Sequence, residues 1–286
     1  MAVVDAGREP GKAWDFAGPA DVAPLGAAII GYRDVGGAGL DLRVAGAPSV
    51  TVMIEFGDRE VIVDDAAGRR RLDGFVAGLA LEPLRVRSER AACIELRLSP
   101  VGGAYSLLGV APTDLGRNVV AVDDLWGRRA RQLREQLADA RTWDERFVLT
   151  TSFLAQCDRT DRAPDPEVVA GWEQILAARG RVQVGALAES LGWSRKRLWA
   201  RFESQIGLTP KRAAMLVRFR SAVDGLLAGR PAAAVAAECG YTDQAHLCRD
   251  VSIFAHGTPG ALASHHLPAI AGHRHRAWGK FFQYRA

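Results

Sequence analysis

Over roughly the first third of the chain, short apolar runs alternate with turn signals. The runs are apolar throughout or alternate apolar with polar residues, which is the pattern of buried or half-buried strands. They are AAIIGY (27–32), SVTVMIEF (49–56), REVIVD (59–64), FVAGLAL (75–81) and CIELRLS (93–99). Glycine and proline residues such as Gly57, Gly68 and Pro83 separate them. Residues 27–123 are therefore predicted to form a small, cupin-like β-barrel or a β-sandwich, preceded by an extension over residues 1–26.

The apolar spacing becomes helical after residue 123. Apolar residues recur at four-residue spacing between Leu125 and Leu137, and a second helical pattern runs from Phe147 to Leu154. Residues 124–157 are therefore predicted to form a helical hairpin. The charged, proline-containing stretch 158–166 is predicted to be a linker.

The last third of the chain contains one pattern twice, in residues 187–210 and 235–259. Each copy predicts a short helix, a tight turn at Gly192 or Gly240, and a second helix that begins at a Ser or Thr cap. A long helix over residues 210–227 joins the copies. At ~1.5 Å per residue this helix is ~27 Å long, close to the ~34 Å between successive major grooves on one face of DNA. A tandem helix-turn-helix domain is predicted over 167–264, followed by a basic, aromatic tail over 265–286. The predicted fold class is α+β.

The second helix of each copy is predicted to enter the major groove of double-stranded DNA. Its inward face is apolar, as at Leu198 and Phe202, and its outward side chains are of the types that contact bases or phosphates. The predicted DNA contacts are Ser194, Arg195, Lys196, Arg197, Trp199, Arg201 and Gln205 in the first unit, and Thr242, Asp243, Gln244, His246 and Arg249 in the second.

The second copy resembles the signature of the AraC/XylS family of bacterial transcription regulators. The matching residues are Ala236, Gly240, Tyr241, Asp243, Gln244, His246, Leu247, Arg249, Thr258 and Pro259. The resemblance implies binding to promoter DNA through both recognition helices and contact with RNA polymerase. An activator is expected rather than a repressor. Val251 stands where the family usually has Phe, and His256 stands where Gly is usual. These departures predict a smaller core and a strained backbone. The second unit is therefore expected to be the weaker reader, that is, to recognise DNA less strongly or less specifically than the first.

The charge is divided unevenly along the 286 residues. Residues 181–286 carry 15 Lys and Arg against 6 Asp and Glu, a net charge of +9, which leaves −5 for residues 1–180 and +4 for the whole chain. This division suits a DNA-reading part joined to a part with another task. The sequence has neither a signal-peptide pattern nor a membrane-spanning apolar run, so a cytoplasmic protein without a membrane partner is expected.

The resemblance implies that the acidic half is a sensor domain. A small-molecule effector is expected in a pocket lined by Tyr32, Phe56, Phe75 and Tyr105, and a homodimer is expected through Trp126, Leu133, Leu137 and Phe147. All six histidines lie at position 246 or later, which argues against a histidine-built metal enzyme in the barrel. No metal, other cofactor or enzymatic activity is expected. Two alternatives remain: a DNA-repair type of enzyme fused to a DNA-binding domain, and a partner-regulated factor without a ligand.

Overall fold

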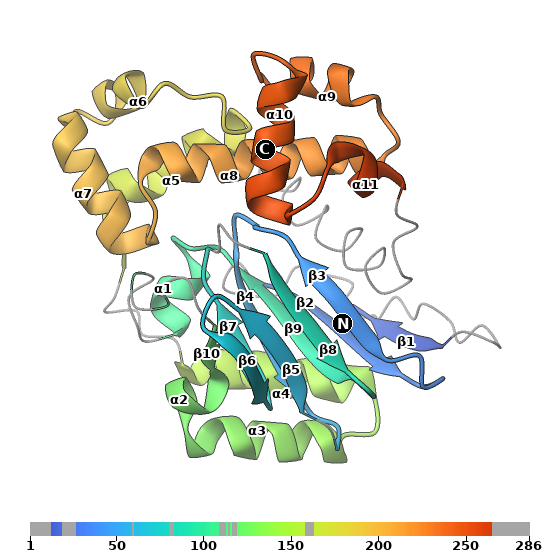
Figure 1. The fold of residues 1–286 in the computed structure, drawn as a ribbon. Helices are drawn as coiled ribbons and strands as arrows, with labels where there is room; N and C mark the ends of the chain where they lie inside the picture. The colour runs from blue at the N-terminus through green and yellow to red at the C-terminus, as the bar shows by residue number, and fades with distance from the viewer. Residues whose placement is uncertain are drawn as a thin grey trace.

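The computed structural model describes residues 13–18, 27–58, 60–79, 83–108, 113, 115, 119–157 and 163–264. A part rich in β-strands is followed by a part made of helices, which confirms the α+β class. In Figure 1 the helical part lies above the sheets, and α3 and α4 lie below them. The predicted extension over 1–26, the linker 158–166 and the tail 265–286 fall largely or wholly outside the described residues.

Two antiparallel sheets make up the N-terminal part. The first has the strand order β1-β2-β9-β4-β7-β10, and the second has the order β3-β8-β5-β6. The strands are β1 (Trp14–Ala17), β2 (Ala27–Asp34), β3 (Leu40–Val44), β4 (Val50–Glu55), β5 (Val61–Asp65), β6 (Gly68–Leu72), β7 (Gly74–Ala77), β8 (Leu84–Ser88), β9 (Ala92–Leu98) and β10 (Val120–Ala121).

The two sheets are not closed into a barrel. No hydrogen-bonded ladder joins them among the described strands, so the barrel predicted for residues 27–123 is instead a pair of open sheets. Alternation of apolar residues is common to barrels and sandwiches. The sequence pattern therefore predicts the strands but not which edges are joined.

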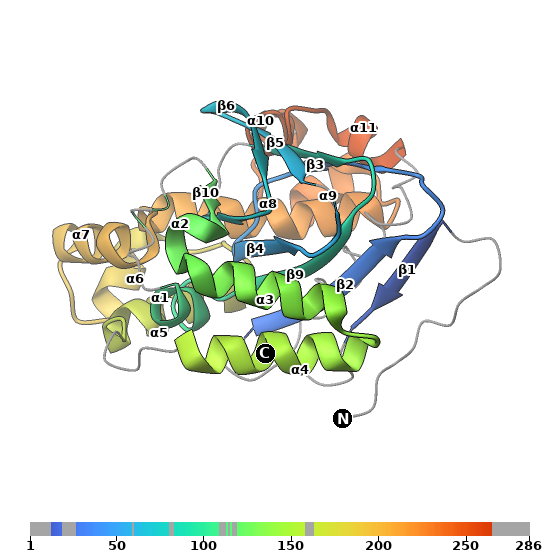
Figure 2. The ribbon, with the colours of Figure 1, turned by 90° about the horizontal axis from the view of Figure 1, so that it is seen from below.

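The alternation along β9 sends its side chains to two different cores. Ile94 and Leu96 belong to an apolar cluster shared with the helices that cover the first sheet, and Cys93 belongs to the cluster between the two sheets. The covering helices are α1 (Gly103–Leu107), α2 (Val122–Trp126), α3 (Arg128–Asp139) and α4 (Trp143–Cys157), and α3 and α4 run side by side across the sheet (Figure 2). At Gly31 of β2, a Cβ would come within 2.2 Å of the Trp143 ring, so a glycine is needed for this close packing.

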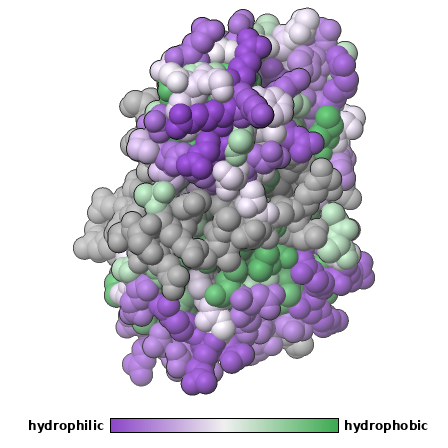
Figure 3. All heavy atoms as spheres, turned by 90° about the vertical axis from the view of Figure 1, so that its left-hand side faces the viewer, coloured by the Kyte–Doolittle hydropathy of each residue, from purple (hydrophilic) through white to green (hydrophobic). Residues whose placement is uncertain are grey.

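The helical part contains α5 to α11. These are α5 (Pro166–Ala177), α6 (Val184–Ser190), α7 (Arg195–Ile206), α8 (Pro210–Leu227), α9 (Ala232–Glu238), α10 (Gln244–Ala255) and α11 (Pro259–Ser264). Seen from the side of α6 and α7, the surface of this part is largely hydrophilic (Figure 3). None of the helices in the described part of the chain is long and apolar enough to cross a membrane.

The N-terminal part packs against the helical part, and two of the contacts involve the loops after β7 and β3. Leu79, which follows β7, belongs to the apolar cluster of the helical part. The backbone N–H of Gly46, between β3 and β4, donates to the carbonyl oxygen of Phe254 at 3.1 Å. Because Phe254 lies in the last turn of α10, this bond satisfies a carbonyl that has no partner within its own helix.

The buried carboxyl group of Glu55 lies at the end of β4 in the first sheet. Oε1 of Glu55 accepts from the backbone N–H groups of Gly57 at 2.9 Å and Ala92 at 2.8 Å, and Oε2 accepts from the thiol of Cys93 at 3.0 Å. Burial raises the pKa of Glu55 from 4.5 to about 7, and these hydrogen bonds oppose the rise. In the pH range between these values the folded chain holds a proton that the unfolded chain has released. The contribution of Glu55 to stability is therefore lost as the pH rises.

We expect the Glu55→Gln variant to lack this pH dependence, because a Gln oxygen keeps both backbone hydrogen bonds but does not titrate. From about pH 4.5 to above about pH 7, the wild type should lose roughly 3 kcal/mol of unfolding free energy relative to the variant, at ~1.4 kcal/mol per pKa unit. Urea titrations at several pH values measure this difference. Parallel pH profiles for the two proteins would contradict the assignment.

Candidate DNA-binding surface

The first helix-turn-helix unit consists of α6, a turn at Gly192, and α7. Gly192 has a φ of +65°, a conformation that glycine adopts without strain. Oγ of Ser194 accepts from the backbone N–H of Arg197 at 3.2 Å and so caps α7, as the sequence predicts. At the other end of α7, Gly207 takes a left-handed conformation. The sequence therefore determines both ends of this helix locally.

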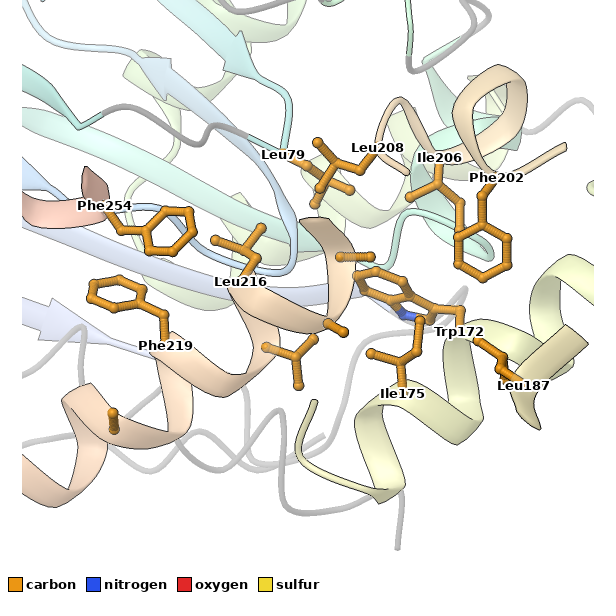
Figure 4. Packing of buried hydrophobic residues seen from close by; sticks show 14 of the residues in the cluster. Leu79, Trp172, Ile175, Leu187, Phe202, Ile206, Leu208, Leu216, Phe219 and Phe254 are labelled. Carbon is orange, nitrogen blue, oxygen red and sulfur yellow. The ribbon is translucent and has the colours of Figure 1, made fainter. Parts of the chain in front are cut away.

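The inner face of α7 packs into the core of the helical part. Leu198 and Phe202 are buried, as predicted, and Ile206 is buried beside them. Figure 4 shows Phe202 and Ile206 near Trp172 of α5, and Leu79 of the N-terminal part beside Leu208. This packing leaves the opposite face of α7 in solvent.

Four of the predicted DNA contacts are exposed, although the guanidinium of Arg195 lies beside α6, where a Cβ on Gly185 would be 2.7 Å from its Nη2. Arg195, Lys196 and Arg197 are exposed at the start of α7, and the Trp199 side chain is 42% exposed. The Arg197 guanidinium lies over the Trp193 ring, 4.5 Å from its centroid. Three cations in the first turn of a helix are unfavourable for the helix dipole. Their position is thus not explained by helix stability.

The two predicted contacts near the end of α7 lie elsewhere. Gln205 is buried, and its Oε1 accepts from the backbone N–H of Asp165 at 2.8 Å. Arg201 donates to both carboxylate oxygens of Asp165, at 2.6 and 2.8 Å, and this pairing lowers the pKa of Asp165. The prediction that Gln205 faces outward is therefore wrong, and Arg201 is engaged at the start of α5. Helical spacing alone did not reveal Asp165 as their partner.

The second unit consists of α9, a turn at Gly240, and α10. Oδ1 of Asp243 accepts from the backbone N–H of His246 at 2.6 Å, so Asp243 caps α10 and the predicted cap Thr242 lies one residue earlier. Gln244 and Arg249 are exposed on the outer face of α10. The second unit thus presents fewer cations than the first, as the sequence indicates.

The inner face of α10 is filled despite the smaller residue at position 251. Leu247, Val251 and Phe254 are all buried. The Phe254 ring lies 4.9 Å from that of Phe219 on α8, so an aromatic pair supplies volume close to the smaller valine. His256 ends α10 with a φ of +48°, the left-handed conformation that its place in the pattern predicts.

A polar cluster attaches α10 to α8. Nη2 of Arg218, on α8, donates to Oδ2 of the buried Asp250 at 3.3 Å and lies 3.4 Å from Nε2 of His246. The same guanidinium lies over the ring of Tyr241, 4.5 Å from its centroid. His246 is thus held by the protein itself, although the sequence predicts it as a DNA contact. Sequence reasoning missed Arg218 because it lies in the joining helix, outside both repeats.

The predicted effector-pocket residues do not share one site. Tyr32 and Phe75 are buried between the sheets, whereas Phe56 lies in the other core, facing Trp143. The side chain of Tyr105 is outside the described part of the structure. A surface hollow of about 540 Å³ lies elsewhere, at the ends of β2 and β9, and its lining includes Arg33, Asp34 and Arg90.

The residues predicted for dimerisation belong to the core of their own domain. Leu133, Leu137 and Phe147 are buried against the first sheet, and the partly buried Trp126 packs against the same cluster. On the outer side of the hairpin, the Val148 side chain is 53% exposed. Within the described residues, no group of three or more His, Cys, Asp or Glu side chains is arranged to hold a metal ion.

Comparison with known proteins identifies the class of the helical part. Residues 187–265 match a family model described as a helix-turn-helix domain. The C-terminal part of the chain is an AraC-type helix-turn-helix domain, a type found in DNA-binding transcription regulators. None of the curated proteins compared with the chain matches it significantly in sequence.

The similar solved structures are remote. ToxT from Vibrio cholerae is 10% identical over 82% of this chain and 97% of ToxT, with a TM-score of 0.48. The C-terminal domain of AraT, a response regulator from Geobacillus stearothermophilus, is 19% identical over 35% of this chain and 84% of that domain, with a TM-score of 0.33. The AraC-like transcriptional activator CuxR is 16% identical over 67% of this chain and 80% of CuxR, with a TM-score of 0.30. Structural similarity this distant does not show what this chain binds.

We expect the Arg218→Met variant to lose about 3 kcal/mol of unfolding free energy, because it leaves the buried Asp250 carboxylate without its cation. The double variant Arg218→Met, Asp250→Leu removes both charges and should recover most of that loss. Urea titrations of the wild type, both single variants and the double variant measure the coupling. A double variant no more stable than Arg218→Met would show that the ion pair is not the source of the effect.

Proposed function

We propose that this protein is a sequence-specific DNA-binding transcription regulator that inserts α7 and α10 into successive major grooves of promoter DNA. The observation that supports this proposal is the pair of helix-turn-helix units carried by one helix, α8, with exposed polar and charged side chains on the second helix of each. With its 18 residues, α8 is ~27 Å long. This length suits two readers on one face of the duplex.

The exposed charges support an unequal division of labour between the two units. The start of α7 carries Arg195, Lys196 and Arg197, whereas the start of α10 carries the uncharged Gln244, with Arg249 one turn further along. Because phosphate neutralisation supplies much of the affinity of DNA-binding proteins, the first unit should bind more tightly. Gln244 and Arg249 supply base contacts in the second unit.

We further propose that the protein activates transcription by contacting RNA polymerase from its promoter site, as its resemblance to the AraC/XylS family implies. A promoter that carries the selected site upstream of a reporter gene tests this role. Expression of the protein should increase reporter output, and a decrease would indicate repression. The proposed action is cytoplasmic and non-enzymatic.

The proposed effector site is the hollow beside Arg33 and Arg90, in place of the pocket predicted from the sequence. Asp34 and Asp58 also line the hollow, and Arg33 is paired with Asp15. Arg90 is therefore the side chain proposed to hold an anionic group of the effector. Thermal unfolding against a panel of small carboxylates and phosphates tests this proposal. A ligand that raises the Tm of the wild type but not that of Arg90→Ala would support it, and a panel without effect would favour a factor regulated by a partner protein.

We expect Arg195→Ala and Lys196→Ala to weaken binding to a selected DNA fragment by ~1–3 kcal/mol each if the side chain contacts a base, and by less if it contacts a phosphate. Gln244→Ala and Arg249→Ala should cost less than this. Fluorescence anisotropy with labelled fragments measures the affinities. Arg141→Ala, an exposed arginine between α3 and α4, is the matched control and should bind as the wild type does. Unchanged binding by both α7 variants would refute the placement of the first reader.

We propose that the protein forms a homodimer through the outer side of the α3–α4 hairpin, where Val148 is exposed. Val148→Glu should then convert dimers to monomers, because a charge in a packed interface is not compensated. Val35→Glu is the control, since Val35, just after the end of β2, is comparably exposed. Light scattering measures the mass. A wild type that is monomeric at all concentrations would overturn this proposal.

A further inference from the structure

The turn between α5 and α6 contains an arginine in a left-handed backbone conformation. Arg179 has a φ of +52°, in the left-handed region that non-glycine residues rarely adopt. It ends α5 through a hydrogen bond from its N–H to the carbonyl of Leu176 at 2.9 Å. Glycine or asparagine is the usual residue at such a helix end. The conformation of the turn therefore does not itself favour an arginine at this position.

This turn is fixed to the middle of α8, between the two helix-turn-helix units. Gly180 packs so closely that a Cβ there would lie 2.2 Å from the carbonyl oxygen of Ala214 and 2.7 Å from the backbone nitrogen of Arg218. The position of the turn relative to both units is therefore rigid. Arg218, on whose backbone Gly180 packs, also donates to Asp250 of α10. The turn and α10 therefore contact the same residue of α8.

Arg181, next in the turn, lies against the second unit. A Cβ on Gly240 would lie 2.9 Å from Cδ and 3.1 Å from Cγ of Arg181, so the aliphatic part of Arg181 rests on the turn that leads into α10. Arg181 also precedes the start of α6 at Val184. In a helix-turn-helix unit, the first helix crosses the DNA backbone. Arg181 thus lies between the backbone-crossing helix of the first unit and the recognition-helix turn of the second.

Both arginines are exposed and carry unneutralised charge. Neither Arg179 nor Arg181 has an acidic partner among the described residues, whereas nearby Arg230 pairs with Glu238. Burial raises the pKa of the Cys239 thiol, and the charges of Arg230, Arg179 and Arg181 oppose that rise. The two arginines therefore gather on one side of the α9–α10 turn, at the junction of the units.

We propose that Arg179 and Arg181 bind the DNA backbone at the centre of the site, where the phosphates pass between the two grooves that α7 and α10 read. This inference rests on the proposed function and adds a contact that neither recognition helix supplies. Contacts to phosphates carry no sequence information, but they set the register of the protein on the duplex. The two arginines thus fix the spacing between the half-sites.

The test compares Arg181→Ala, Arg179→Gly and the control Arg141→Ala on a selected DNA fragment over a range of salt concentrations. Each lost phosphate contact should reduce the slope of log K against log salt by ~0.9, so that the loss of affinity from about 50 to about 200 mM salt becomes roughly threefold smaller. The loss should be equal on the selected fragment and on unrelated DNA. Arg181→Lys should restore most of the slope.

Arg179→Gly separates DNA binding from folding. Glycine relieves the left-handed strain, so the Tm of this variant should equal or exceed that of the wild type while its DNA affinity falls. Phosphate ethylation should interfere with wild-type binding at the centre of the site and have no effect there on the double variant Arg179→Gly, Arg181→Ala.

A salt slope unchanged in both single variants, or no ethylation interference at the centre of the site, would overturn this inference and leave the proposed function intact. Failure of the wild-type chain to select any DNA would instead overturn the proposed function, and this inference with it.

Discussion

The burial of α8 between its neighbours is the constraint on which the helical part depends. Its buried residues lie on more than one face, with Leu216 and Phe219 among the most deeply buried. Small residues let other helices approach closely: at Gly225, a Cβ would lie 3.0 Å from a methyl carbon of Val235 on α9. Because α8 packs against α5, α7, α9 and α10, neither unit can rotate about it without exposing apolar surface. The separation of the two recognition helices is thus a property of the core.

The N-terminal part contacts both units near the ends of their recognition helices. Leu79 meets the first unit beside Leu208, just after α7 (Figure 4), and Gly46 donates to the last turn of α10. Both contacts lie at the carboxyl ends of the two helices, while the exposed polar residues lie at the amino ends. The contacts at Gly46 and Leu79 therefore leave the surface proposed to bind DNA uncovered.

The sequence predicts the helical part well because the residues that begin and end its helices are neighbours of those helices in the sequence. Ser194 caps α7 and Gly192 forms the turn before it, so boundaries follow from neighbouring residues. Sequence reasoning did worse wherever the partner was distant. The burial of Gln205 depends on Asp165, and the engagement of His246 depends on Arg218 of the joining helix. No helical periodicity specifies such pairs.

The same limit explains the errors in the N-terminal part. The five apolar runs correspond to β2, β4, β5, β7 and β9, whereas β1, β3, β6, β8 and β10 were not predicted. Several of the missed strands lie at a sheet edge or carry arginines in alternation with apolar residues, which weakens the apolar signal. Whether two sheets close into a barrel depends on hydrogen bonds between distant strands, which residue alternation does not encode.

The open edges of these sheets have a consequence for solubility. A sheet that does not close leaves unpaired backbone groups along its outer strands, and such edges invite further strands from other molecules. The outer strand β6 reads GRRRL, and it carries Arg69, Arg70 and Arg71 in succession. Arg69 and Arg70 pair with Asp64 and Asp65 of β5, and Arg71 is exposed. A second copy of β6 approaching edge to edge would have to remove water from these charged groups. The three arginines thus disfavour the pairing of β6 with a strand of another molecule at this open edge of the sheet.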